Sequence, residues 1–431
     1  MNKLKIGIGI IILVIAFAMY WSYNQTIVLK VGVFAGSNWD VPNGSGYKLI
    51  DTAIARFEEE HPNVKIEYKS GILKEDYSLW LADQIIEGNE PDVFIVLGDD
   101  FNTLSSVGAL KDLTGLIEND KSFDINNYYG SVLKIGQYEG NQYALPYESN
   151  PKLMFVNKTL LEKEGIPMPK NDWTLDDFYD ICKKVTKDSD GDGIIDQYGC
   201  YNFTWIDAIN GYNLQLFNED GTACYLNRDE VKEALTFMKN LNELNQGYNV
   251  KANDFDKGKI VFAPMPFSQY RAYKPYPWSI KKYSTFEWDC VRMPVAKNKK
   301  HVSEVSSLLM AISSRTTHSK EAWDFLKMLT YNEQSQKDLF QYSQGVSSLK
   351  SVIRSDEVNN LLNKDKLQES QVNMNLLDDV MESAVTAGQF KKYDTALSIM
   401  DRNIREIIQD NDDLDMSLID LQKEVNKYLR N

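Results

Sequence analysis

Cysteine and histidine, the residues that most often bind transition metals, are scarce in this sequence. Its cysteines are Cys182, Cys200, Cys224 and Cys290. No two of them have C-x-x-C spacing, and the three histidines lie too far apart in the sequence for a metal motif, so no zinc or thiolate centre is predicted. We expect buried free thiols, although a disulfide is permitted outside the cell. The sequence also lacks G-x-S-x-G and any phosphate-binding glycine loop, so no motif predicts an enzyme.

Positive charge is also in deficit. The chain has 47 Lys and Arg residues against 62 Asp and Glu residues, which gives a net charge of -15. Such a surface repels phosphate backbones and anionic headgroups, so nucleic acid is excluded as an expected partner. With 43% hydrophobic and 25% charged residues over 431 positions, the composition predicts a folded chain of two lobes.

Only one long apolar run occurs, at the N-terminus. Residues 6–21 are all apolar or glycine, and they follow Lys3 and Lys5. As a helix the run covers about 24 Å, slightly less than a hydrocarbon core of about 30 Å. Lysines before the run place the rest of the chain outside the cytoplasm. No A-x-A cleavage site ends the run, and no cysteine there can accept a lipid. We therefore predict that residues 1–26 are an uncleaved signal-anchor, which is a transmembrane segment. The alternative is a cleaved signal peptide and a secreted protein.

Hydrophobic periodicity then predicts alternating strands and helices. Strands are expected at 27–34, 64–68 and 92–97, with helices at 47–60 and 77–86 between them. This order is typical of βαβ units, in which a parallel sheet carries helices on both faces. Beyond residue 153 the pattern becomes more helical, and 361–429 reads as charged surface helices.

Five stretches, taken in order, resemble the extracellular solute-binding proteins that serve sugar ABC importers. They are residues 57–66, 88–94, 143–178, 254–262 and 293–326. The resemblance extends from about Val28 to about Val352 and implies a periplasmic-binding-protein-like α/β fold of two lobes with a hinge, here preceded by the N-terminal membrane helix. Lobe 1 is then expected at 27–146 with 286–331 returning to it, and lobe 2 at 147–285 with 332–431 packing on it. The chain differs from many relatives in lacking a lipid-modified cysteine.

Polar and aromatic side chains follow the predicted strands of the first lobe. They are Ser37, Asn38, Trp39, Asp99, Asp100 and Glu148. In open α/β sheets ligands bind beyond the carboxyl ends of strands, and sugars need planar polar groups and aromatic faces. We therefore predict that these residues bind the ligand, although exposed carboxylates are often only solvated.

The second lobe offers a further set of candidate ligand-binding residues. They are Trp205, Asn213, Tyr270, Arg271 and Trp278. Prolines near the last three disfavour a buried strand, so we expect a loop that presents aromatic side chains to the ligand; packing against the hinge is the alternative.

Residues 188–196 form the sharpest local motif, D-x-D-x-D-G with a further acid at the ninth position. The expected ligands of a structural calcium ion are Asp188, Asp190, Asp192, the Ile194 carbonyl and Asp196. Position twelve is Gly199, so the bidentate Glu of an EF-hand is missing. The alternative is a solvated Asp/Gly turn without an ion.

These features predict a monomeric, non-enzymatic binding protein that captures a carbohydrate by hinge closure and delivers it to a membrane ABC permease. Two alternatives stay open. One is a tethered sugar sensor or adhesin, and the other is a glycosidase that uses a carboxylate pair such as Asp99 or Asp100 with Glu148.

Overall fold

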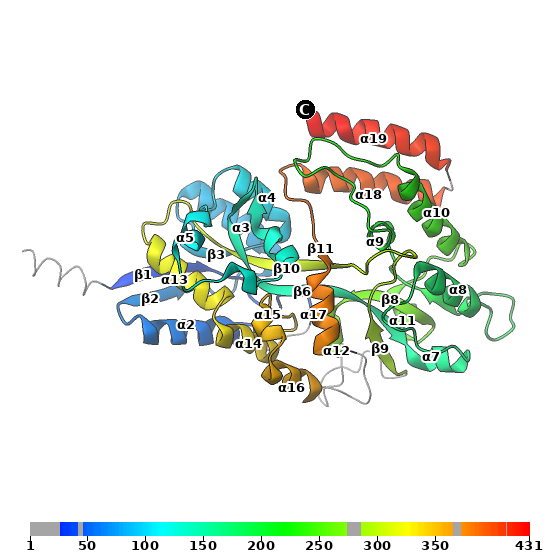
Figure 1. Ribbon diagram of the computed structural model, residues 1–431, viewed down its shortest axis with the longest axis horizontal. Coiled ribbons are helices and arrows are strands. Elements are labelled where there is room, and N and C mark those ends of the chain that lie inside the picture. The colour runs from blue at the N-terminus through cyan, green and yellow to red at the C-terminus, as the bar shows by residue number, and fades with distance from the viewer. Residues whose placement is uncertain (1–25, 42–45, 274–285, 365–371, 411) are drawn as a thin grey trace, which may run out of the picture.

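One long strand, β6 (Ala144–Asn157), belongs to both lobes of the computed structural model (Figure 1). The structure describes residues 26–41, 46–273, 286–364, 372–410 and 412–431. Residues 144–151 of β6 pair with β10 (Ser303–Ile312), whereas residues 152–157 pair with β8 (Ile260–Pro266) and β9 (Trp288–Val291). The two lobes therefore share one mixed sheet, with the order β2-β1-β3-β10-β6-β8-β7.

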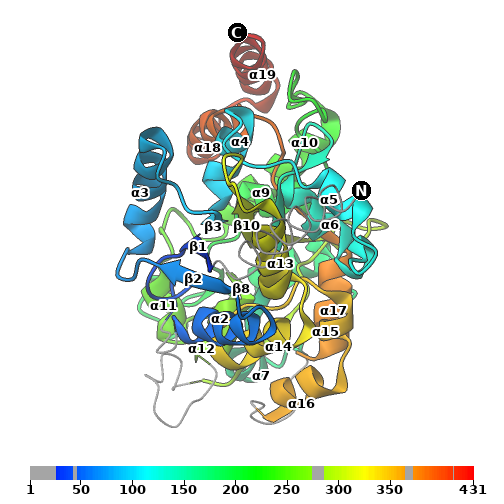
Figure 2. The ribbon, with the colours of Figure 1, turned by 90° about the vertical axis from the view of Figure 1, so that its left-hand side faces the viewer.

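The first lobe confirms the predicted alternation of strands and helices. Strand β1 (Ile27–Gly32) pairs in parallel with β2 (Val64–Tyr68) and with β3 (Val93–Val96), and all four residues of β3 are buried. In Figure 2 these strands lie between α2 (Lys48–Glu60) and α3 (Lys74–Glu87). β10 runs antiparallel to β3 and is followed by α13 (Ser319–Thr330). The remaining elements of this region are α4 (Gly98–Ser106), α5 (Thr114–Asn119), η1 (Ile125–Asn127), α6 (Gly130–Leu133), η2 (Lys134–Gly136), β4 (Gln137–Tyr138) and β5 (Asn141–Gln142).

The second lobe surrounds the distal half of β6. β8 pairs with β6 on one side and in parallel with β7 (Tyr198–Cys200) on the other. Its helices are α7 (Lys158–Lys163), α8 (Leu175–Val185), α9 (Trp205–Gly211), α10 (Asp229–Glu243), α11 (Ala252–Asp256) and α12 (Phe267–Tyr273). The expected cap of α8 is present, because Thr174 and Asp177 form a capping box. β9 also belongs here, so the chain returns to the first lobe at β10 and not at residue 286.

The C-terminal helices, expected as residues 332–431 to pack on the second lobe, contact both lobes. They are α14 (Glu333–Tyr342), α15 (Lys350–Ile353), α16 (Asp356–Lys364), α17 (Met374–Glu382), α18 (Tyr393–Gln409) and α19 (Leu414–Arg430). α14 packs on α2 of the first lobe, where Arg56 and Asp338 form an ion pair of 3.0 Å. Short strand β11 (Ala384–Val385) pairs with β10, and α18 then packs against α10 and α19. The amphipathic pattern predicts that a helix packs, but it does not say on which lobe.

Two hydrophobic clusters support this architecture. The first fills the N-terminal lobe and continues beneath the junction, with Phe57, Phe94 and Tyr270 among its members. The second lies in the other lobe and includes Phe178 and Phe262 together with Met400 of α18. Within the described residues no helix is long and apolar enough to span a bilayer. The predicted signal-anchor, residues 1–26, lies outside the described residues except for Thr26.

Candidate functional site

A buried carboxylate lies at the junction of the lobes. Glu148 of β6 is fully buried, and its carboxylate accepts hydrogen bonds from Asn38 Nδ2 at 2.6 Å and from the Gly345 backbone N–H at 2.7 Å. The Trp39 indole and the Ser343 hydroxyl lie beside the same carboxylate. Burial raises the pKa of Glu148 above its usual range, although the hydrogen bonds act in the opposite direction. We call Asn38, Trp39, Glu148, Ser343 and Gly345 the hinge cluster.

The backbone of Gly345 lies very close to two side chains of the hinge cluster. A Cβ atom on this residue would lie 2.3 Å from Glu148 Oε1 and 2.6 Å from Trp39 Nε1. Both distances are far below van der Waals contact, so a larger residue at this position would have to displace the Glu148 or Trp39 side chain. Sequence reasoning found Asn38, Trp39 and Glu148 but missed Ser343 and Gly345. The sole available signal was a glycine shortly after the end of a helical pattern.

Arg271 connects the second lobe to the same segment. Its guanidinium donates to the carbonyls of Ser343 at 2.8 Å, Gly345 at 3.3 Å and Phe340 at 2.5 Å, and the last of these lies near the C-terminus of α14. A cation there suits the negative end of the helix dipole. In this conformation Arg271 therefore holds α14 and the hinge cluster, which agrees with the predicted alternative of packing at the hinge.

The expected aromatic loop has a different structure. Residues 267–273 form helix α12, since the prolines that break the pattern come only after it. Tyr270 is buried, stacked on Phe267 and edge-on to Trp288. Trp278 lies outside the described residues. The prediction of a loop at 267–273 is wrong.

Acidic side chains from both lobes gather near the start of α4. Asp99 is exposed, and Asp100 accepts a hydrogen bond of 2.6 Å from Ser78 Oγ. Asn102 Nδ2 donates to the Gly388 carbonyl at 3.2 Å, which ties α4 to the segment before α18. Burial raises the pKa of Asp394 on α18, and the negative charge of Asp99 adds to this effect. Asp394 escaped sequence reasoning because it lies in a helix rich in charged residues.

The other predicted residues lie apart from the hinge cluster or have structural contacts. Ser37 Oγ accepts hydrogen bonds from the backbone N–H groups of Trp39 and Val41, so it shapes the loop after β1. Trp205 is buried, and its Nε1 donates to Asp401 at 2.8 Å. Asn213 is exposed just after α9 in a left-handed conformation (φ 57°). A role of these residues in ligand binding stays a prediction.

An ion-pair network also crosses the junction. Lys152 Nζ lies 3.0 Å from Asp207 of α9 and 2.6 Å from Glu304 of β10, so it joins the two lobes. Burial lowers the pKa of Lys152, but the two carboxylates more than offset this, and the net pKa is raised. Asp207 is almost fully buried and also completes the capping box of α9 with Thr204.

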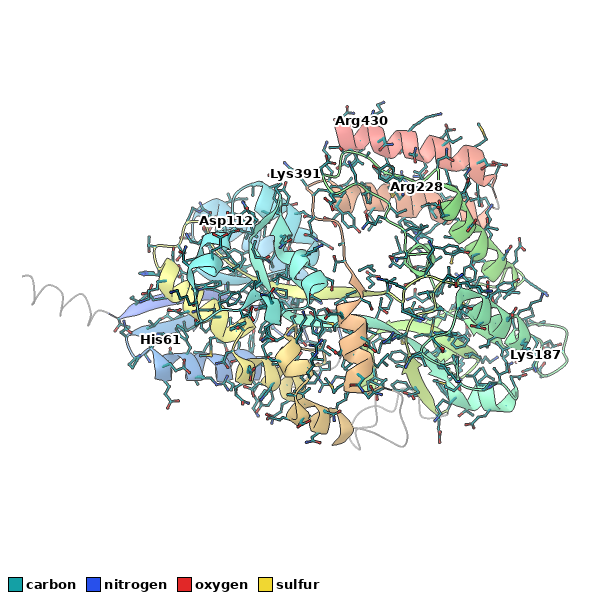
Figure 3. All side chains as sticks on the ribbon, viewed as in Figure 1. His61, Asp112, Lys187, Arg228, Lys391 and Arg430 are labelled. Atoms are coloured by element: carbon teal, nitrogen blue, oxygen red, sulfur yellow. The ribbon has the colours of Figure 1, made fainter. Side chains whose placement is uncertain are left out.

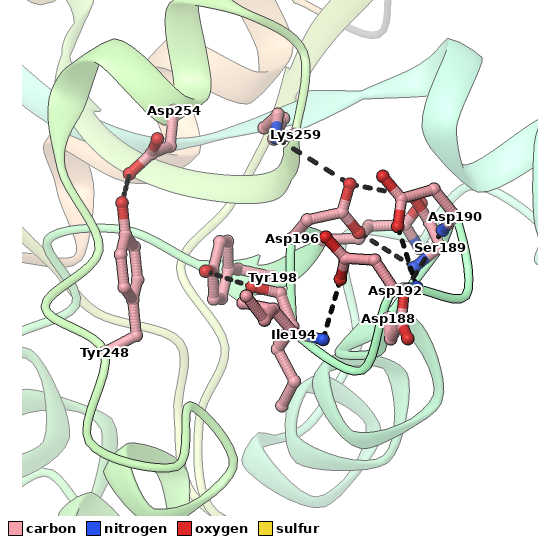
Figure 4. A network of polar contacts seen from close by, with 12 residues as sticks. Asp188, Ser189, Asp190, Asp192, Ile194, Asp196, Tyr198, Tyr248, Asp254 and Lys259 are labelled. Carbon is pink, nitrogen blue, oxygen red and sulfur yellow. Dashed lines mark hydrogen bonds and ion pairs between the residues drawn. The ribbon is translucent and has the colours of Figure 1, made fainter.

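Figure 4 shows the aspartate loop, residues 188–196, from close by. Figure 3 shows Lys187, which precedes the loop, at the outer end of the second lobe. Carboxylate oxygens of Asp188, Asp190 and Asp192 lie within 4.8 Å of one another. Asp196 accepts a hydrogen bond of 2.8 Å from the Ser189 N–H and lies 3.7 Å from Lys259 Nζ.

Three of the expected calcium ligands therefore converge, and all four aspartates also accept hydrogen bonds from backbone N–H groups of the loop. Asp188 accepts backbone hydrogen bonds from Gly193 at 2.6 Å and Gly191 at 2.7 Å. The bond from Gly193 has the largest effect in lowering the pKa of Asp188. The loop is consistent with cation binding by oxygen ligands, and these hydrogen bonds alone also stabilise it as a turn.

Comparisons with known proteins identify the family of this chain. The model of the bacterial extracellular solute-binding proteins matches residues 52–365. The galactooligosaccharide-binding protein of Bacillus subtilis is 22% identical over 366 residues, which cover 79% of this chain and 80% of that protein. The multiple sugar-binding protein of Streptococcus mutans is 24% identical over 310 residues, 66% of this chain and 68% of that protein.

Solved structures share the fold. The cyclic α-maltosyl-1,6-maltose binding protein of Arthrobacter globiformis is similar with a TM-score of 0.79 at 17% identity, covering 94% of this chain and 100% of that one. An ABC substrate-binding protein of Listeria monocytogenes in complex with cycloalternan has a TM-score of 0.72 at 19% identity, with 94% and 99% covered. At these identities the likeness concerns the two-lobed architecture alone.

Proposed function

Because this chain belongs to the bacterial extracellular solute-binding protein family, we propose that it captures a sugar or oligosaccharide between its lobes and delivers it to an ABC importer. The observation that carries the proposal is the convergence of polar groups from both lobes where β6 crosses between them. Asn38, Trp39 and Glu148 come from the first lobe, and Arg271 reaches the same segment from the second. The relatives named for oligosaccharides and multiple sugars support the ligand class.

Hinge closure is the expected mechanism. The lobes are joined by β6 and by the ion pair between Lys152 and Glu304, and a rotation about this junction would leave the second hydrophobic cluster within its own lobe. A ligand that contacts both lobes binds the closed form more tightly and shifts the population towards it. Asp99 on α4 and Asp394 on α18, one on each lobe, are then suited to accept hydrogen bonds from sugar hydroxyls.

A thermal-shift screen of residues 26–431 against a carbohydrate panel tests the ligand class. We expect an oligosaccharide at 100 times its Kd to stabilise the protein by about 2.7 kcal/mol. Asp99→Asn should weaken that shift, and Asp112→Asn, a matched exposed carboxylate elsewhere in the first lobe, should not. Stabilisation by amino acids or peptides and by no sugar would overturn the proposal. Release of reducing ends from the panel would favour the glycosidase alternative, which the burial of Glu148 already weakens.

We also propose that residues 1–26 tether the chain to the outer face of the membrane beside its permease. The basic residues before the apolar run support this orientation. Fractionation of cells that express the full chain should recover it with membranes, and detergent extraction followed by cross-linking should recover an ABC permease. Recovery in the medium with a shortened N-terminus would show cleavage instead. Recovery with a receptor domain and no permease would favour the sensor alternative.

A structural calcium ion in the aspartate loop is a separate proposal. The convergence of Asp188, Asp190 and Asp192 supports it. We expect calcium to raise the melting temperature over a chelator control, and Asp190→Asn to abolish the increase. Asp220→Asn, on an exposed acid in another turn, is the matched control. An unchanged melting temperature at millimolar calcium would refute the proposal.

A further inference from the structure

The two most exposed large apolar side chains of the described residues lie on one helix of the first lobe. Ile86 and Leu79 of α3 are 82% and 69% exposed. They are seven positions apart, so they lie on the same face of the helix. Tyr77, on the opposite face, is buried and donates to the carbonyl of Gly32 in β1. Figure 2 shows α3 at the outer edge of the first lobe, so the face with Leu79 and Ile86 is open to solvent.

A third exposed side chain lies near the end of α3. Val107, which follows α4, is 63% exposed. Arg315 donates to the Ile85 carbonyl at 2.5 Å, and the neighbouring Ser314 Oγ donates to the Gly108 carbonyl at 2.7 Å. Residues 314–315 thus bring the ends of α3 and α4 together. We call Leu79, Ile86 and Val107 the α3 patch.

The α3 patch lies towards the edge of the sheet at which the chain enters β1. Helix α3 connects β2 to β3, and both strands are parallel to β1, so its last turn lies at the amino ends of these strands. The loop between α3 and β3 is bonded to β1, because the Asp92 N–H donates to the Lys30 carbonyl at 2.8 Å. In Figure 1 β1 begins on the left, the side that Figure 2 presents to the viewer.

The sequence before β1 limits the distance of this edge from the membrane. Residues 6–21 are the apolar run of the proposed anchor, so only residues 22–26 separate the anchor from β1. Five residues span at most about 17 Å when they are fully extended. With the anchor in the bilayer, the amino edge of the sheet is therefore held close to the membrane surface, and Ile86 and Val107 with it.

Charge indicates what covers the patch. Exposed carboxylates flank Leu79 and Ile86 along α3, and they form no ion pair within the described residues. They are Glu75, Asp76, Asp83 and Glu87. Glu87 lies in the last turn of α3, where it opposes the helix dipole and no basic residue accompanies it, so it does not stabilise the helix. Anionic headgroups and a second copy of this chain, with its net charge of -15, are both repelled by such a face.

We propose that the α3 patch docks on the extracytoplasmic surface of an integral membrane protein that presents aliphatic and basic side chains. The proposal rests on the proposed function and its tether, under which this partner is the ABC permease. All three residues of the patch belong to the first lobe. The contact therefore holds that lobe in place and leaves the second lobe free to close on the ligand.

Photo-crosslinking of the full chain in the membranes of its native cells tests the proposal. A benzophenone amino acid at position 86 or 107 should give an adduct with an ABC permease subunit, identified by mass spectrometry. The same probe at Met416, which is 63% exposed on α19 of the second lobe, is the matched control and should give none. Adducts with lipid alone, adducts with a second copy of the chain, or no adduct from positions 86 and 107 would overturn the proposal.

Two variants test the apolar contact and the charge. Ile86→Ser should lower the adduct yield from position 107 about tenfold, because an aliphatic side chain buried at an interface contributes roughly that much to affinity. Glu87→Lys should also lower the yield, since the flanking charge is reversed, without lowering the melting temperature, because a cation suits the end of the helix. Glu424→Lys makes the same charge change at an exposed position of α19 and should leave the yield unchanged. Equal losses for the two lysine variants would contradict docking at α3.

Thermal stabilisation by sugars is a separate readout. Its absence, with permease adducts retained, would count against the sugar ligand alone. Its presence, with no adducts from positions 86 and 107, would count against the docking surface alone.

Discussion

Replacing Lys152 with methionine is the sharpest test of how the lobes are joined. The substitution removes an ammonium group that lies 3.0 Å from Asp207 and 2.6 Å from Glu304 while preserving most of the side-chain volume. Only 2% of the Asp207 side chain is exposed, whereas 44% of the Glu304 side chain is exposed. The variant therefore leaves one buried and one solvated carboxylate without their cation.

The exposure of the partners determines the cost. Breaking a buried ion pair by removing one partner costs about 3–5 kcal/mol, because the remaining charge is buried and uncompensated. Asp207 keeps the hydrogen bonds from Thr204 N and Oγ1, and 24% of the Lys152 side chain is exposed, so we expect a loss somewhat below this range, about 2–4 kcal/mol. The pair with Glu304 should contribute less than about 1 kcal/mol, as exposed pairs do.

Urea unfolding at pH 7, followed by tryptophan fluorescence, measures these differences. Lys152→Met should lower the unfolding free energy by about 2–4 kcal/mol and Glu304→Gln by less than about 1 kcal/mol. The double variant Lys152→Met/Asp207→Asn should recover part of the loss, because the uncompensated charge is gone. Equal losses for Lys152→Met and Glu304→Gln, or no recovery in the double variant, would refute the reasoning from burial.

Three further perturbations test other parts of the structure. The pKa of Glu148 is raised in the folded protein, so the wild type loses stability as pH rises above about 4.5 and through that raised pKa. Glu148→Gln cannot titrate, so in urea unfolding its stability should fall less than that of the wild type over the same rise in pH. Gly345→Ala should cost about 1–3 kcal/mol, measured by calorimetry, since its Cβ would meet Glu148 Oε1; unchanged stability would contradict the close approach. Thr174→Ala should cost about 1 kcal/mol in the same assay through loss of the α8 cap, and Thr174→Ser should cost less.

The order of strands and helices in the first lobe could be predicted, because the spacing of apolar residues that distinguishes strands from helices is a local property of the sequence. The continuous apolar run at 93–96 is a buried strand, as expected, and the helix before it buries Tyr77 and Leu81. The assignment of C-terminal helices to lobes could not be predicted in the same way. The sequence pattern of an amphipathic helix such as α14 predicts that one face is buried, but it does not predict which surface covers that face.

The candidate site was only partly predictable for a related reason. Asn38 follows β1, so the rule for the carboxyl ends of strands identified it, whereas Glu148 lies inside β6 and does not follow a strand. Gly345 donates to Glu148 from 197 positions further along the chain, and its place after a helix does not predict that contact. The prolines near residues 267–273 predict a loop, but they follow helix α12 in the sequence and do not interrupt it. Trp205 was assigned to the ligand by residue type, although its indole packs inside the lobe and bonds Asp401.

Strand β6 limits where residues can be inserted into or deleted from the sequence. Every second residue from 148 to 152 makes a different contact. Glu148 belongs to the hinge cluster, and Asn150 accepts a hydrogen bond from the Ser268 N–H at the start of α12. Lys152 forms the ion pairs with Asp207 and Glu304. In a strand, a slip of one residue turns every side chain to the opposite face. Insertion or deletion of a single residue between positions 148 and 152 would therefore misplace contacts in both lobes at once. Loop lengths elsewhere can drift during evolution, whereas the length of this segment is fixed by two lobes that use the same strand.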